Sequence, residues 1–194
     1  IQRIRTNSLD FKSKWLICQF FEKWKYIPID SIWFIQQNND LDLKYLISIL
    51  NSFLFNIYYK LHYTDKNVKP IYLKELPIKN ISLSEQKPFI EKADFMLDKN
   101  KELQEKVSKF IKRLNSSFEI EKLSKKLEAF YDLEFSDFVK ELKKKKIEMS
   151  LKDQDEWEEY FDSYKKEILE IKSQIDICDK EIDEMVFDLY GLSE

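Results

Sequence analysis

Apolar residues recur at alternating steps of four and three along two long stretches of the chain, which is the spacing of a coiled-coil seam. The first series consists of Phe89, Ala93, Met96, Leu103, Val107, Phe110 and Leu114, with Asn100 at one of its positions. The second consists of Trp157, Phe161, Tyr164, Ile168, Ile171, Ile175, Cys178, Ile182, Met185 and Leu189. We therefore predict long helices over 84–114 and 152–190 that pair antiparallel. Pairing of the same seam between two copies of the chain is the alternative.

Polar residues mark where these two helices begin. Ser82 and Glu85 have the spacing of a capping box, and Ser150 with Asp153 resembles it. Between the long helices, two shorter apolar series predict two short helices that form the bend. These series are Ile120, Leu123, Leu127 and Phe130, and then Phe135, Phe138, Val139 and Leu142, which the KKKK run at 143–146 follows.

Before residue 80 the pattern changes. WLICQFF (15–21), SIWFIQ (31–36) and IYLKELPI (71–78) have strand composition and predict extended segments. Between Leu43 and Leu61 the apolar residues instead return at helical spacing, and they predict one helix that Asn39 or Asp40 would cap.

These patterns predict an α+β fold that is mostly helical overall. We expect a small mixed α/β recognition globule over residues 1–80, followed by a helical spacer, an antiparallel coiled-coil-like arm, over residues 81–194.

Charge divides the chain at the same place. Residues 1–80 hold 12 Lys and Arg against 7 Asp and Glu, whereas residues 81–194 have a net charge of −8. The front part also holds 15 of the 29 aromatic residues. A basic, aromatic module suits nucleic acid, while acidic helices suit solvent. Aromatic side chains in a core and lysines on the surface would give the same composition.

We predict that the basic front part contacts double-stranded DNA. The predicted phosphate contacts are Arg3, Arg5, Lys12, Lys14, Lys23, Lys25, Lys66 and Lys69. The predicted contacts to base edges are His62, Thr64 and Asn67.

The chain lacks most residues that enzymes use. Gly191 is the only glycine, which argues against glycine-rich phosphate loops and a Rossmann core. His62 is the only histidine, which excludes sites with several histidine ligands and disfavours a nucleophile–His–acid triad. D-x-K triplets at Asp10 and Asp42 could serve a metal-dependent nuclease, but neither has an evident partner acid, and we interpret both as surface charges. We predict no catalytic residue, metal site or cofactor in this chain.

Cysteine usage and hydropathy favour a cytoplasmic protein. Cys18 and Cys178 have no metal-ligand spacing, and we expect both to be reduced and packed. The most apolar run, over 43–61, contains Lys44 and two asparagines, so it predicts a buried helix rather than a membrane span. No signal peptide is visible, and a chain that begins at Ile1 is expected to be a piece of a larger protein.

Four short motifs occur in an order that resembles a known family. LNS (50–52) lies in the helix predicted between Leu43 and Leu61. LPI (76–78) precedes the helix predicted over 84–114, and EQ (85–86) follows LPI at a short interval. IDEMVFDLYGLSE (182–194) comes last. In order and spacing these motifs resemble the TaqI-like C-terminal target recognition domain of type IIG restriction–modification enzymes. They are similar also to motifs of type I specificity subunits.

The resemblance implies a DNA specificity fragment that recognises the target and positions methyltransferase or nuclease domains of the same or an associated chain. The parent protein would methylate adenine with S-adenosylmethionine, and would need magnesium if a nuclease is fused. The glycine-containing cofactor motif and the Asn/Asp-Pro-Pro-aromatic motif of the methyltransferase are absent from this sequence. The alternative is a non-catalytic coiled-coil interaction module, which would form a homodimer through its helical arm.

Overall fold

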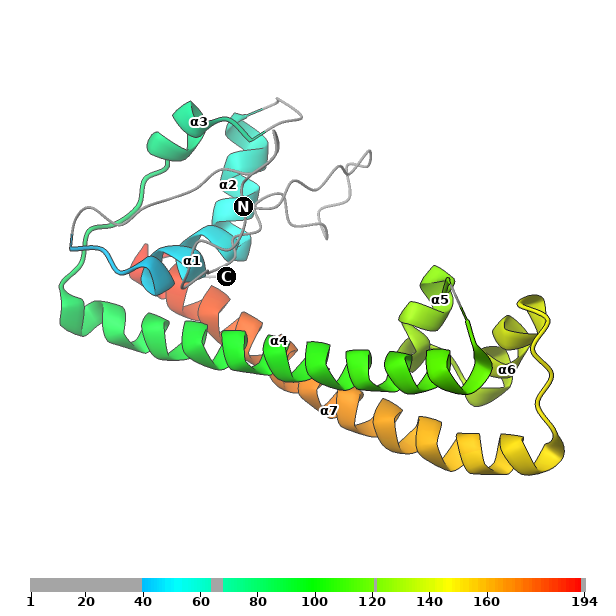
Figure 1. Ribbon diagram of the computed structural model, residues 1–194. Coiled ribbons are helices and arrows are strands. Elements are labelled where there is room, and N and C mark those ends of the chain that lie inside the picture. Colours follow the sequence, from blue (N-terminus) through cyan, green and yellow to red (C-terminus); the bar gives the residue numbers. More distant parts are fainter. Residues whose placement is uncertain (1–39, 64–67, 121, 193–194) are drawn as a thin grey trace. The chain divides into compact units, whose positions relative to one another are not determined.

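The computed structural model describes residues 40–63, 68–120 and 122–192, and every regular element in that part of the chain is a helix (Figure 1). The helices are α1 (Leu43–Asn51), α2 (Phe53–His62), α3 (Pro70–Lys74), α4 (Leu83–Phe118), α5 (Lys125–Glu128), the 3-10 helix η1 (Phe130–Asp132), α6 (Phe135–Lys144) and α7 (Leu151–Leu189). None of the described helices has the length and apolar content needed to cross a membrane.

The chain divides into two compact units. Unit 1 combines the described residues up to Leu97 with those from Ile177 onward, and unit 2 is Asp98–Asp176. Each of the long helices α4 and α7 contributes one part to each unit.

The predicted α+β fold class is wrong, because no strand occurs in the described residues. The segment 71–78, predicted as extended, forms α3 and then an irregular stretch. Pro70 occupies the first turn of α3, where its fixed φ and missing N–H suit a helix start. The strand composition of this segment gave a wrong prediction, because the periodicity of so short an apolar run does not distinguish a helix from a strand. The predicted extended segments at 15–21 and 31–36 lie outside the described residues.

The helix predicted between 43 and 61 is two helices, separated at Ser52. This serine has an extended backbone, with φ −64° and ψ 154°, and its hydroxyl accepts the Phe55 N–H at 3.4 Å. It therefore caps α2 while ending α1. Asp42 caps α1, a few residues beyond the predicted cap.

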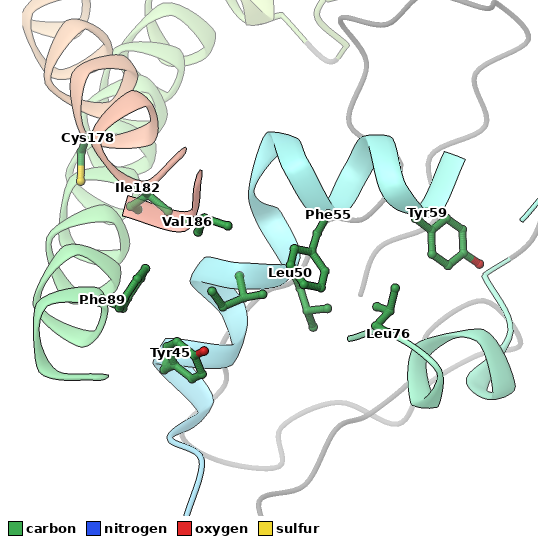
Figure 2. Packing of buried hydrophobic residues seen from close by; sticks show 10 residues of the cluster. Tyr45, Leu50, Phe55, Tyr59, Leu76, Phe89, Cys178, Ile182 and Val186 are labelled. Carbon is green, nitrogen blue, oxygen red and sulfur yellow. The ribbon is translucent and has the colours of Figure 1, made fainter. Parts of the chain in front are cut away.

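The core of unit 1 forms where α1 and α2 meet the first part of α4 and the last part of α7 (Figure 2). The rings of Tyr45 and Phe89 meet edge to face at 5.3 Å, an arrangement that adds to the burial of apolar area. Cys178 is a free, buried thiol in this core, as predicted, whereas Cys18 lies outside the described residues. The buried members are Tyr45, Ile49, Leu50, Phe55, Tyr59, Leu76, Phe89, Cys178, Ile182 and Val186.

Unit 2 has a second, aromatic core. Phe110 of α4 stacks on Phe130 of η1 with ring centroids 3.6 Å apart, and it also contacts Phe138 of α6 and Phe161 of α7. The short helices thus cover the α4–α7 pair in this unit. The buried members are Phe110, Leu114, Leu127, Phe130, Phe138, Val139, Leu142, Met149, Phe161 and Ile168.

The two long helices and their caps are confirmed. Ser82 and Glu85 exchange the hydrogen bonds of a capping box at the start of α4. Ser150 and Asp153 do the same at the start of α7. Asn100, which the pattern assigned to the seam, is exposed.

Within each unit α4 and α7 run antiparallel. In unit 2, Lys106 forms an ion pair with Glu167, while further along α4 the ring of Phe118 contacts Trp157, which is earlier in α7. In unit 1, Lys92 forms an ion pair with Glu181 at 2.6 Å. The apolar seam predicted from the sequence therefore packs inside the chain.

Three helices end in the same way, with a residue in the left-handed region. These residues are Glu119 after α4 (φ 48°), Lys146 after α6 (φ 64°) and Gly191 after α7 (φ 65°). In each case the next N–H donates to a carbonyl five residues earlier, which is the long hydrogen bond of a Schellman motif. Only the last of the three has the residue that this backbone prefers.

Candidate nucleic-acid interface

Four aromatic rings gather where α2 ends and α3 begins. Tyr58 and His62, one turn apart on α2, stack with centroids 4.0 Å apart and planes 18° apart. Tyr63 stacks on Tyr72 of α3 at 4.3 Å and 17°. Together with Lys69 these four residues form what we call the aromatic–basic surface.

The aromatic–basic surface rests on the core of unit 1. Tyr59 is fully buried, and its ring contacts Tyr63 at 4.9 Å and Tyr72 at 6.4 Å between centroids. Rings that are supported by a packed core keep their orientation, which favours recognition of a ligand of fixed shape.

His62 has a defined proton position. Its Nδ1 lies 2.9 Å from the carbonyl oxygen of Tyr58, and because a carbonyl only accepts, Nδ1 carries the proton. In the neutral ring Nε2 is then an acceptor, and in the imidazolium it is a donor. The side chain is exposed at the C-terminus of α2.

Lys69 and Tyr63 have partners at the other side of this surface. The Lys69 ammonium lies 5.4 Å from the ring centroid of Tyr72, a cation–π distance, and 3.5 Å from its hydroxyl. The Tyr63 hydroxyl donates to Glu75 at 3.3 Å. Partial burial, and then the Glu75 carboxylate, raise the pKa of Tyr63, so its phenol is neutral at physiological pH.

Of the predicted DNA contacts, His62 and Lys69 lie in the described residues. The structure brings them onto the same surface, because His62 contacts Tyr63, Tyr63 stacks on Tyr72, and Lys69 lies over the Tyr72 ring. Their contact with DNA stays a prediction. The others lie outside the described residues: Arg3, Arg5, Lys12, Lys14, Lys23, Lys25, Thr64, Lys66 and Asn67.

The tyrosines of this surface are not among the DNA contacts predicted from the sequence. A signal existed for the pair on α2, because Tyr58 and His62 are four residues apart and therefore neighbours on a helix. No comparable signal existed for Tyr72, since its segment was interpreted as extended.

The Asp42–Lys44 triplet has structural roles. The Asp42 carboxylate accepts the Lys44 N–H at 2.7 Å as the cap of α1, and the Lys44 ammonium pairs with Asp94 at 2.5 Å. Across the described residues, no three His, Cys, Asp or Glu side chains lie close enough together to hold a metal ion. The other triplet, at Asp10, lies outside the described residues.

The LNS motif meets the last part of α7. Because Ser52 interrupts the helix, the Phe53 N–H has no carbonyl one turn earlier in its own helix, and it donates instead to the Asp183 carboxylate at 2.7 Å. Asn56 donates to the Leu50 carbonyl at 3.3 Å across the same break. The first motif and the ID of the last motif are therefore parts of one joint.

The LPI motif meets LYGL in a second joint. The Tyr190 hydroxyl donates to the Pro77 carbonyl at 2.7 Å and accepts the Lys79 N–H at 2.9 Å. The Lys79 ammonium donates to the Leu189 carbonyl at 2.7 Å. These bonds hold the irregular stretch before α4 against the end of α7.

Gln86 of the EQ motif forms the third joint. Its fully buried side chain accepts the Asp42 N–H at 2.8 Å and donates to the carbonyls of Asp40 (3.1 Å) and Ile81 (2.9 Å). Glu85 belongs to the cap of α4. All four motifs thus serve the packing of unit 1, which gives their order and spacing a common physical cause.

The chain matches the family model described as a domain of unknown function (DUF8810) over residues 82–186. No curated protein and no solved structure matches the chain. The match begins at the cap of α4 and includes all of unit 2, whereas the aromatic–basic surface precedes it. Because the match covers more than half of the sequence, the chain belongs to the DUF8810 family.

Proposed function

We propose that this member of the DUF8810 family is the C-terminal DNA specificity fragment of a restriction–modification enzyme. It recognises double-stranded DNA and positions methyltransferase or nuclease domains of the same or an associated chain. It contributes no catalytic group of its own. The adenine methylation, with S-adenosylmethionine as donor, belongs to the parent protein.

The observation that carries this proposal is that His62 and Lys69 lie on the same surface, the aromatic–basic surface. A lysine ammonium suits a phosphate oxygen, and histidine and tyrosine can hydrogen-bond to phosphates or to base edges. Here the two residues share a surface with stacked rings that lie on a packed core. Such a surface presents charge and hydrogen-bonding groups in fixed positions, as sequence recognition needs.

The joints between the motifs support the resemblance behind the proposal. Phe53, directly after LNS, contacts the ID of the last motif, and LPI contacts its LYGL, although more than 100 residues separate the members of each pair. Motifs that hold one unit together are expected to occur together. The long helices α4 and α7 suit the positioning role, because paired helices hold a distance better than loops do.

The proposal is tested by the salt dependence of DNA binding. Lys66→Ala combined with Lys69→Ala removes two predicted phosphate contacts, so the log–log slope of affinity against salt should fall by about two. The matched control is Lys87→Ala with Lys101→Ala, which removes two exposed lysines of α4. Fluorescence anisotropy with a labelled duplex gives both slopes. An unchanged slope for the first pair removes this loop from the interface.

Target recognition is tested by selecting bound duplexes from a randomised DNA pool at moderate salt. We expect an enriched motif of several base pairs. Binding without any motif would leave only phosphate contacts, and the fragment would not then specify the target. Absence of binding at every salt concentration would favour the coiled-coil interaction module instead.

A further inference from the structure

Unit 2 carries a second basic surface, and none of the predicted DNA contacts belongs to it. It lies over α5, the exposed side of α6 and the residues that follow α6. We call it the lysine surface, and its members are Lys126, Lys140, Lys143, Lys144, Lys145 and Lys146.

A nearly buried carboxylate organises part of the lysine surface. Glu141 of α6 has a side chain only 11% exposed, and its Oε1 lies 2.7 Å from the Lys144 ammonium and 3.6 Å from that of Lys126. One negative charge thus serves two lysines from two different helices. The pairing holds these ammonium groups on the outer side of α5 and α6 without neutralising both.

The rest of the lysine surface is in positive excess. Lys140 pairs with Asp137 at 2.7 Å. Lys143, Lys145 and Lys146 are exposed, and within the described residues no carboxylate lies at ion-pair distance from any of them. Surface lysines usually occur among acids, so three uncompensated charges within four residues form a local positive field.

The fold does not explain the lysine at position 146. Lysines in the last turn of a helix are favoured by the dipole, which accounts for Lys143 and Lys144. Lys146 follows the helix with φ 64°, where its N–H donates to Lys143 and the Ile147 N–H donates to Leu142. Glycine or asparagine is preferred at that position of a Schellman motif. A lysine there costs stability, and its neighbours add like-charge repulsion.

We propose that the lysine surface binds the phosphate backbone of double-stranded DNA, as a second contact that is independent of base sequence. This inference rests on the proposed function, because both require DNA as the partner. It assigns a DNA contact to unit 2, which lies entirely within the part that matches the DUF8810 family. Its chemistry is that of ammonium groups which displace counterions from phosphates.

Duplex DNA fits this surface better than an anionic membrane does. The exposed positions of α6 carry Ser136, Asp137 and lysines, with no large apolar side chain among them. A basic helix that binds a membrane surface also needs an apolar face to insert. Leu151, at the start of α7, is exposed but stands alone after the lysine run.

The first test replaces Lys143, Lys145 and Lys146 together with glutamine. We expect the log–log slope of DNA affinity against salt to fall by about three, one for each lost contact. The control variant replaces Lys101, Lys152 and Lys166 with glutamine. These are exposed lysines of unit 2 outside the lysine surface, so the control changes the net charge by the same amount. Its slope should equal that of the unchanged protein.

A second variant separates binding from folding. Lys146→Gly relieves the left-handed backbone, so it should raise the denaturant midpoint while lowering the slope by about one. Glu119→Gly is the matched control, because it relieves the same backbone at the end of α4. It should raise the midpoint without lowering the slope.

The outcomes distinguish the two proposals. Unchanged slopes in the triple variant and in Lys146→Gly, with DNA binding intact, would overturn the lysine surface and leave the proposed function standing. Failure of the unchanged protein to bind DNA would overturn both. Lysine-dependent binding to phosphatidylserine vesicles, with no change in DNA binding, would overturn the assignment to DNA in favour of a membrane.

Discussion

Gly191 lies where the backbone favours a residue without a side chain. It follows α7 with φ 65°, and the Leu192 N–H donates to the Phe187 carbonyl at 3.0 Å across it. A Cβ built at this position would meet no atom within 4 Å. The preference for glycine therefore comes from the local conformation and not from crowding.

Gly191→Ala should lower the free energy of unfolding by about 1 kcal/mol, because the left-handed conformation is strained for any residue that has a Cβ. Urea denaturation followed by circular dichroism measures this loss. Lys180→Ala, at an exposed position within α7, is the control and should change stability by a few tenths of a kcal/mol. A loss of several kcal/mol would indicate a steric clash that the open surroundings do not predict.

Local residue roles could be predicted from the sequence, but distant ones could not. The capping box of Ser82 and Glu85 spans three residues, so its spacing is visible in the chain. Gln86 is next to it and is equally important to the packing, yet its partner Asp42 is 44 residues away. The stacking of Tyr63 on Tyr72 likewise depends on a turn that the sequence pattern did not reveal.

At the scale of elements, Ile171 occupies the seam of α7. Its side chain is only 4% exposed, whereas Ile177, later in the same helix, is 56% exposed. The same substitution at the two positions therefore compares a buried with a solvated charge in one helix.

Ile171→Asp should destabilise the protein by several kcal/mol, since an unpaired charge would be buried in the seam. Ile177→Asp should cost far less, because its charge remains in water. Thermal melting and far-UV circular dichroism measure both. Equal melting temperatures for the two variants would contradict the packing of α7 described for each unit.

The long helices could be predicted because a period sustained over many turns leaves no alternative structure. The break between α1 and α2 was not predicted. It depends on Ser52 acting as a cap and on the Asp183 carboxylate accepting a hydrogen bond from the Phe53 N–H. Helix α3 has five residues, too few for periodicity to outweigh composition. Short elements are decided by tertiary contacts, which a single sequence does not display.

For the whole molecule, three carboxylates make the free energy of unfolding depend on pH in the acidic range. Hydrogen bonds from Ser82 lower the pKa of Glu85, and the Lys140 and Lys144 ammonium groups lower the pKa values of Asp137 and Glu141. A carboxyl whose pKa is lower in the folded than in the unfolded protein stabilises the fold above its unfolded pKa. That stabilisation is lost as the pH falls through the folded pKa.

Glu141→Gln should lower stability at neutral pH and make the acid side of the stability curve shallower, because one linked carboxyl is gone. Urea denaturation from neutral to acidic pH measures the slope. Glu148→Gln, which removes an exposed acid close to the same helix, is the control. An acid limb as steep in Glu141→Gln as in the unchanged protein would show that the Lys126 and Lys144 pairs contribute nothing to it.

The change of charge at residue 80 and the division into units describe different properties. The charge pattern concerns the surface, and the functional boundary predicted from it, between 1–80 and 81–194, stays a prediction. Packing depends on buried residues, and these join the described residues before Leu97 to those after Ile177. No local sequence pattern predicts that these two stretches pack into one unit, since they are far apart in the chain and meet only in the folded protein.

Unit 1 is closed by residues that the ribosome makes after the whole of unit 2. Asp183 and Tyr190 supply the partners of the Phe53 N–H and of the Pro77 carbonyl, so α1 and α2 leave the ribosome long before their partners exist. Unit 2, by contrast, is one unbroken stretch from Asp98 to Asp176. The order of synthesis therefore lets the second unit complete its core first, while the earlier helices wait for the end of α7.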